Sequence, residues 1–236
     1  MTAQTISEKI LSAHCGHPVR VGEIAVCRID CVIGTDGSGP MAIDYFEQMG
    51  GQALFDPSRV FFSLDHYAPP DTPQTRAFHQ RIRAFAASHG ATVFEVGDGI
   101  SHQVVVDRGL VRAGDPLVGA DSHTVTCGAL NAFAIGVGSS DLAAAMLTGK
   151  IWLRVPETVR VILRGHRRAG VAAKDVALWL IQRFGGDGAN YQAIEFAGDA
   201  LPAFTMSDRL VLCNLMAEAG AKAAIFPNPI TSDPRA

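Results

Sequence analysis

The chain has 236 residues and a nearly balanced charge, with 20 lysines and arginines against 23 aspartates and glutamates and a net charge of −3. This balance excludes a basic protein that binds phosphate backbones. Charged residues make up only 18% of the sequence and hydrophobic residues 48%, which excludes a disordered chain and predicts a sizeable core. The length suits one large α/β domain or one domain with part of another, and we expect the second arrangement.

The composition also bears on the compartment. No apolar stretch approaches the roughly 20 residues that span a bilayer, and the N-terminus lacks a basic region followed by an apolar core and a cleavage site. We therefore expect a cytoplasmic protein. The cysteines are odd in number, scattered, and never spaced as Cys-x-x-Cys, which favours reduced thiols over a disulfide framework. They are Cys15, Cys27, Cys31, Cys127 and Cys213.

Apolar periodicity predicts alternating helices and strands through the first two thirds of the chain. The predicted helices are residues 6–13, a short helix after Pro40, residues 75–88 with Phe78, Ile82 and Phe85 at helical spacing, and small-residue helices within 128–148. The predicted strands are residues 23–33, with Cys27 and Cys31 on one face, then 59–64, 91–96 and 116–119. This alternation is typical of a three-layer α/β/α domain with a mainly parallel sheet.

A boundary is predicted at Val155-Pro156, because the residue before proline is pushed out of helical geometry. We thus expect an α/β domain over residues 1–155 and a partial second α/β domain over 156–236. The second part is predicted to contain strands at 158–163 and 194–196 and helices at 174–184 and 207–219, the last capped by Ser207. A polar tail, residues 228–236, follows.

Three polar groups interrupt apolar runs at predicted strand ends, where catalytic residues of α/β proteins collect. They are Asp65-His66, His102 in GDGISHQVV, and Asp121-Ser122-His123-Thr124. Taken singly, Asp121 is equally an ordinary helix N-cap and His66 a hydrogen-bonded core imidazole. Three groups on one sheet are harder to explain in that way, since buried histidines and carboxylates are costly unless paired or used. The remaining histidines, at 14, 17, 79, 89 and 166, are interpreted as surface residues.

Residue chemistry leaves the function of these groups open. Imidazole and carboxylate suit zinc or iron, which would make a divalent-metal site for a hydrolase. The same residues could serve as general acids and bases around a cofactor bound elsewhere. No compact motif such as His-Glu-x-x-His decides between the two hypotheses.

Several motifs resemble the aconitase and isopropylmalate dehydratase large-subunit family. The run VGADSHTVTCGALNAFAIGVGSSDLAAAMLTGKIWLRVPETVRVILRG is similar to the family's strand ending in Asp-Ser-His-Thr, its Gly- and Ala-rich region and its Val-Pro-Glu segment. LDHYAPP, GDGISHQVV, AAKDVALWLI and LCNLMAEAGAKAAIFP resemble four further family segments, in the family's order. Together they cover nearly the whole chain and resemble the N-terminal portion of such a protein.

The resemblance implies a hydro-lyase of the kind that isomerises a hydroxy di- or tricarboxylic acid by removing and re-adding water, as isopropylmalate dehydratase does in leucine biosynthesis. It implies a [4Fe-4S] cluster as Lewis acid. By matching motifs, Asp65 and His66 would form an acid–imidazole pair, His102 and Asp121 would surround the departing hydroxyl, and His123 would pair with Glu218. Asn214, Ser122 and Asp36 would lie on the substrate side.

The cysteines depart from the family pattern. The family's cluster ligands, one cysteine alone and two as Cys-x-x-Cys, lie in a further domain, and none of the five cysteines here matches them. We expect no cofactor on the isolated chain, and partner chains that supply the cluster and a swivelling domain, with a small carboxylic acid as substrate and no nucleic acid or membrane partner. The alternatives are a truncated, non-catalytic relative that serves as a binding or assembly module, and a stand-alone divalent-metal enzyme.

Overall fold

The computed structural model describes residues 4–227, and its centre is a five-stranded sheet in which every neighbouring pair is parallel. The strand order is β4-β3-β2-β5-β6. The strands are β2 (Cys31–Thr35), β3 (Val60–Ser63), β4 (Thr92–Phe94), β5 (Pro116–Gly119) and β6 (Phe133–Gly136). The mixed α/β fold with a mainly parallel sheet is as predicted.

Alternate residues of these strands face two separate cores. Val32 and Phe62 join the cluster covered by α2 (Gly39–Gln48), α3 (Pro73–His89) and α5 (Ser139–Thr148). Ile33 and Phe61 join the cluster on the opposite face, under α4 (Ser101–Asp107) and the 3₁₀ segment η2 (Ser122–Leu130). Because both faces are covered, the strands are largely apolar, as is typical of parallel strands between helical layers.

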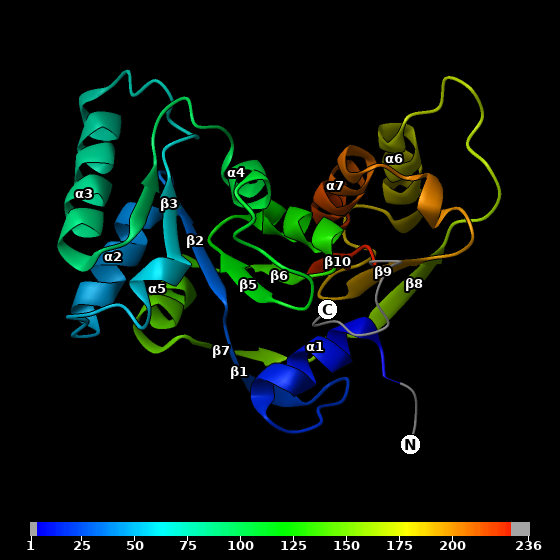
Figure 1. Ribbon diagram of the computed structural model, residues 1–236, viewed down its shortest axis with the longest axis horizontal. Coiled ribbons are helices and arrows are strands. Elements are labelled where there is room, and N and C mark those ends of the chain that lie inside the picture. Colours follow the sequence, from blue (N-terminus) through cyan, green and yellow to red (C-terminus); the bar gives the residue numbers. More distant parts are fainter. Residues whose placement is uncertain (1–3, 228–236) are drawn as a thin grey trace.

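A second parallel sheet of three strands lies beside the first (Figure 1). It has the order β10-β9-β8 and a core of its own, against which α6 and α7 pack. Its elements are β8 (Thr158–Ile162), α6 (Ala173–Phe184), β9 (Ala193–Ala197), η3 (Leu201–Ala203), α7 (Met206–Leu215), η4 (Met216–Ala219) and β10 (Ala223–Ile225). Segment η2 packs against β6, β10 and α7, so it joins the two sheets. The predicted domain boundary near residue 155 stays a prediction.

The expected single strand over residues 23–33 is wrong. The chain instead forms β1 (Ile24–Arg28), which pairs antiparallel with β7 (Lys150–Arg154) in a separate ribbon, and then β2. The break falls at Ile29 and Asp30, whose amides bond to Gly149 and Pro116. Cys27 and Cys31 consequently belong to different strands rather than to one face.

Other local expectations also need correction. The structure has a disulfide between Cys15, at the end of α1 (Ile6–Cys15), and Cys27, whereas reduced thiols were expected. The predicted helical region 128–148 contains the end of η2, strand β6 and then α5. Helix α7 is capped by Thr205, which accepts a hydrogen bond from the Asp208 amide, not by Ser207.

The predicted tail, the membrane expectation and one short element complete the description of the fold. The predicted polar tail, residues 228–236, lies outside the described residues. Among residues 4–227, no helix has both the length and the apolar character required to cross a membrane. The remaining short element is η1 (Pro57–Arg59).

Candidate active site

Three neighbouring strands deliver the acidic residues of the site. Asp36 directly follows β2, Asp65 follows β3 after one intervening residue, and Asp121 follows β5 in the same way. Strand β2 lies between β3 and β5, and all three are parallel. The carboxyl ends of parallel strands meet at one edge of the sheet, which is where α/β proteins bind ligands.

His66 bridges two of these carboxylates. Its Nδ1 lies 3.0 Å from Asp65 Oδ1 and its Nε2 lies 3.0 Å from Asp121 Oδ2. The hydrogen bonds to Asp121 and Asp65 outweigh burial and raise the pKa of His66 to about 10. At neutral pH the ring is therefore an imidazolium that donates from both nitrogens. Burial would raise the pKa of Asp65, but the bonds from His66 and the Ser101 amide lower it on balance.

Asp121 is the centre of an Asp/His cluster that consists of Asp65, His66, His102 and Asp121. Its Oδ1 accepts hydrogen bonds from His102 Nε2 at 3.1 Å and from the His123 amide at 2.7 Å, while Oδ2 faces His66. The bonds from His102 and His66 hold the pKa of Asp121 well below its usual range. Asp121 also caps η2 through the His123 amide. It is therefore both an ordinary N-cap residue and a member of the Asp/His cluster.

His102 reaches Asp121 from a helix rather than from a strand end. It lies in the first turn of α4 and is buried, which corrects the expectation that it follows a strand. Its Nδ1 is buried and has no hydrogen-bond partner among residues 4–227. The loop before α4 contains Gly97 and Gly99, both at positive φ, which allow the backbone to turn sharply from β4 into this helix.

The helical segments that accompany the second sheet contribute two further predicted residues, Asn214 and Glu218. Glu218 of η4 places Oε1 3.4 Å from His123 Nε2, so the two are in ion-pair range. Asn214 of α7 donates from Nδ2 to Thr126 Oγ1 at 2.8 Å. Both contacts are made to η2, which explains how a segment far along the sequence reaches the Asp-Ser-His-Thr turn.

One cavity is lined by Asp121 and a second by its hydrogen-bond partner His102. One, of about 530 Å³, is lined by Asp121, Ser122, Lys222 and the turn that leads into α5. Another, of about 320 Å³, lies between α4 and α7 and is lined by His102, Asn214 and several apolar side chains. A small carboxylic acid could approach the cluster from either side.

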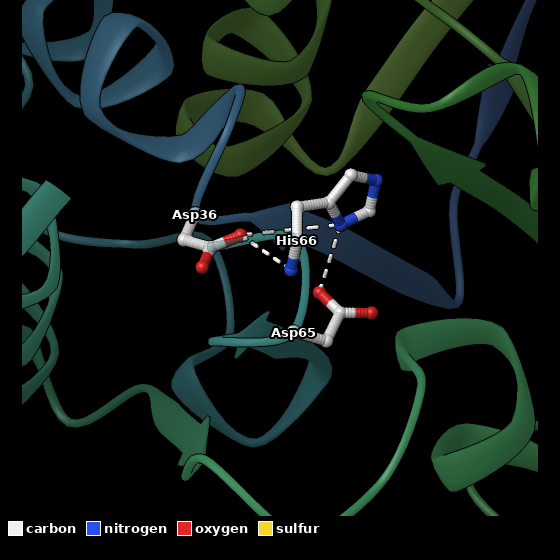
Figure 2. Close-up of side chains that lie close together, drawn as sticks. All are labelled: Asp36, Asp65 and His66. Carbon is white, nitrogen blue, oxygen red and sulfur yellow. Dashed lines mark hydrogen bonds and ion pairs between the residues drawn. The ribbon is translucent and has the colours of Figure 1, made fainter. Parts of the chain in front are cut away.

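Asp36 lies beside His66 and Asp65 (Figure 2) and is buried rather than open to a substrate. It has no exposed surface, and its oxygens accept from the His66 amide at 3.0 Å and the Tyr67 amide at 2.9 Å. His79, predicted to be a surface residue, is only 1% exposed and places Nε2 2.8 Å from Asp36 Oδ2. Sequence reasoning missed His79, although its spacing from Thr75 and Ile82 puts all three on one face of α3.

A metal ion would have to compete with these internal contacts. Asp36, Asp65 and His66 each offer a ligand atom, and the three atoms lie within 4.8 Å of one another. His66 Nδ1, however, donates to Asp65, and both Asp36 oxygens already accept hydrogen bonds. A protonated imidazole is not a metal ligand. The arrangement is therefore better suited to proton chemistry than to metal binding.

The cysteines do not fit an iron–sulfur cluster, which needs three converging thiolates. Cys15 and Cys27 are joined to each other, and Cys31, Cys127 and Cys213 are buried. Burial raises the pKa of Cys127 to about 12 and raises that of Cys31 and Cys213 as well. Neutral thiols in a dry core are poor iron ligands, so these residues would not hold the group.

Comparison with known proteins identifies the family. Residues 8–231 match the model of the Aconitase family (aconitate hydratase). The 3-isopropylmalate dehydratase large subunit 1 of Methanopyrus kandleri is 44% identical over 225 residues, which cover 95% of this chain and 54% of that protein. The large subunit of Syntrophus aciditrophicus is 44% identical over 231 residues, covering 96% of this chain and 55% of the relative. The chain belongs to the aconitase family.

The matches also show how much of the relatives' length this chain covers and which fold it shares. The chain spans about half the length of the curated relatives it matches. A crystal structure of Thermococcus kodakaraensis aconitase X in its holo-form aligns with a TM-score of 0.53 at 12% identity, covering 98% of this chain and 65% of that one. At such low identity this likeness concerns the fold alone.

Proposed function

We propose that this chain is the part of a hydro-lyase that supplies acid–base side chains for the reversible dehydration of a hydroxy di- or tricarboxylic acid such as isopropylmalate. The observation that carries the proposal is the bridge of His66 between Asp65 and Asp121, with both ring nitrogens 3.0 Å from a carboxylate oxygen. The similarity to 3-isopropylmalate dehydratase large subunits supports the reaction class.

The arrangement suits the demands of dehydration. A hydroxyl leaves poorly unless a proton reaches it, so an acid must lie beside it. His66 is protonated at neutral pH. A substrate hydroxyl that displaced Asp121 from Nε2 would receive that proton and leave as water, while the proton on the neighbouring carbon would pass to a base supplied by the swivelling-domain partner. Asp121 stays ionised and would stabilise the imidazolium when the proton returns in the hydration direction. His102 bonds to the other oxygen of Asp121 and thereby fixes the orientation of the carboxylate.

The other predicted residues would orient the substrate and its surroundings. Glu218 would hold the His123 ring, as a carboxylate commonly orients a catalytic imidazole. Ser122 lines the larger cavity and Asn214 the smaller one, so both are placed to contact a carboxylic acid. Asp36 is enclosed, which favours a supporting role over direct contact with substrate.

Partners complete the proposal. A [4Fe-4S] cluster of the family's kind would supply a Lewis acid, and its thiolates would come from a cysteine-bearing partner rather than from this chain. A small subunit with the swivelling domain is the second expected partner, in keeping with the name "large subunit" carried by the relatives.

The test is to recover the tagged chain anaerobically from its native cells. Iron and sulfide are quantified, and hydration of an unsaturated dicarboxylate is assayed on the eluate. A cysteine-bearing partner, about four iron and four sulfide per complex, and hydration activity would support the proposal. The chain alone, without iron or activity, would contradict it and favour a non-catalytic relative. Stoichiometric zinc or iron without sulfide would instead favour a stand-alone metal enzyme.

A further inference from the structure

His79 and Asp36 form a buried hydrogen-bonded pair beside the proposed active site. The Asp36 side chain has no exposed surface and the His79 ring is 1% exposed, with 2.8 Å between Nε2 and Oδ2. A buried carboxylate is costly unless several donors surround it. Asp36 meets this requirement with three donors, one from His79 and two from backbone amides.

Those two amides belong to His66 and Tyr67, in the turn that follows β3. The same turn presents the His66 ring to Asp65 (Figure 2). The other ring nitrogen faces Asp121. Asp36 Oδ1 also lies 3.9 Å from His66 Nδ1, so the buried carboxyl group is close to the ring as well as to the backbone of the turn. Helix α3, through His79, is thus linked to the backbone that carries the proposed acid.

We infer that His79 and Asp36 are positioning residues that fix the Asp65–His66 turn, so that the His66 ring bridges Asp65 and Asp121. Neither residue needs to touch substrate in this role. Asp36 acts through the His66 and Tyr67 amides, and His79 acts through Asp36. The importance of the role for catalysis rests on the proposed function, whereas the positioning itself does not.

A structural role alone predicts only a loss of stability when His79 is replaced. Positioning predicts in addition that the environment of the His66 ring changes while the fold persists. The titration of the His66 ring nitrogens, followed by NMR in the ¹⁵N-histidine-labelled chain, reports on its two carboxylate partners. Amide exchange at His66 and Tyr67 reports on the hydrogen bonds to Asp36.

His79→Leu removes the donor and retains an apolar side chain of similar reach. We expect the His66 pKa to fall by at least about one unit as its carboxylate contacts loosen, and the His66 and Tyr67 amides to exchange about tenfold faster or more. His79→Gln retains a side-chain N–H that can reach Asp36, and it should restore both readouts towards the wild type. That rescue separates a positioning hydrogen bond from simple packing.

The matched control is His14→Leu. His14, in α1, also places Nε2 2.8 Å from an aspartate, Asp30. Asp30 pairs in addition with Arg59 and makes no contact with the site. This variant should lose stability and leave the His66 signals unchanged. If His79→Leu does not fold, Asp36→Asn carries the test, because the amide cannot accept all three donors and should shift the same signals.

An unchanged His66 titration and unchanged amide exchange in a folded His79→Leu or Asp36→Asn chain would overturn the inference. Neither readout requires turnover. The positioning role can therefore fail while the proposed function holds, and the proposed function can fail while the positioning is observed.

Discussion

Asp121→Asn isolates the charge at the centre of the cluster. Asn caps helices about as well as Asp, so the bond to the His123 amide can persist while the negative charge is lost. Hydrogen bonds to a charged group contribute about 1 kcal/mol more than neutral ones. We count the hydrogen bond from His102 at its full value and the bond from His66 at half, because 40% of the His66 side chain is exposed to solvent. The free energy of unfolding should then fall by about 1.5 kcal/mol.

For a chain of this size that loss corresponds to a Tm lower by about 3–6 °C. The assay is thermal unfolding at pH 6 followed by circular dichroism. Asp30→Asn is the control, since Asp30 also pairs with a histidine, His14, but lies away from the cluster. In Asp121→Asn alone, the His66 pKa should also fall, because the Asp121 hydrogen bond is the largest cause of its elevation.

The pH dependence has a definite sign. The folded-state pKa of His66, about 10, lies above its ordinary value of 6.5, so the stabilisation is fully present below pH 6.5 and is lost as pH rises through 10. The Tm difference between wild type and Asp121→Asn should therefore be largest near pH 6 and should shrink towards pH 10. An equal Tm at pH 6, or a difference that grows with pH, would refute the assignment of His66 as a protonated bridge.

Two further predictions concern the scaffold. Gly128→Ala should lower the unfolding free energy by about 3 kcal/mol in denaturant unfolding, because a Cβ there would lie 1.7 Å from the Ala224 carbonyl oxygen where η2 packs on β10. Gly186→Ala is the control, because a Cβ added there would meet no atom within 4 Å, and it should change the unfolding free energy by less than about 0.5 kcal/mol. Similar losses in the two variants would show that η2 is not tightly packed at Gly128. Replacing both Cys15 and Cys27 by serine should lower the unfolding free energy by about 3 kcal/mol, and peptide mapping that found both thiols free in the native chain would exclude the disulfide.

Much of the fold could be predicted from the sequence because parallel strands buried on both faces are apolar throughout. Strand β2 is buried at every position and β3 likewise. The sequence predicts a single strand over residues 23–33 because the outward residues of β1, Ile24 and Val26, are also apolar, although they are 72% and 57% exposed. An alternation of polar and apolar residues would have distinguished the β1–β7 ribbon from a buried central strand, and the residue types of β1 do not show it.

The site was predictable only in part. Asp65, His66 and Asp121 interrupt apolar runs at strand ends, and this signal is visible in the sequence. His79 lies within a helix, where polar residues are common. Of the predicted face, Ile82 and Phe85 are buried, but His79 rather than Phe78 is the buried residue one turn earlier. Burial of His79 depends on a partner, Asp36, that is 43 residues away in the chain. Such pairing follows from strand order, which local patterns do not encode.

The central claim is that the Asp121–His66 pair performs the acid–base chemistry of a hydro-lyase. The most direct measurement is the hydration rate of an unsaturated dicarboxylate by the anaerobically recovered complex, compared between wild type, Asp121→Asn and Asp30→Asn at equal iron content. The account predicts a loss of about 10²-fold or more for Asp121→Asn and a rate close to wild type for Asp30→Asn. A rate for Asp121→Asn equal to that of the control, with the partner and the iron retained, would contradict it.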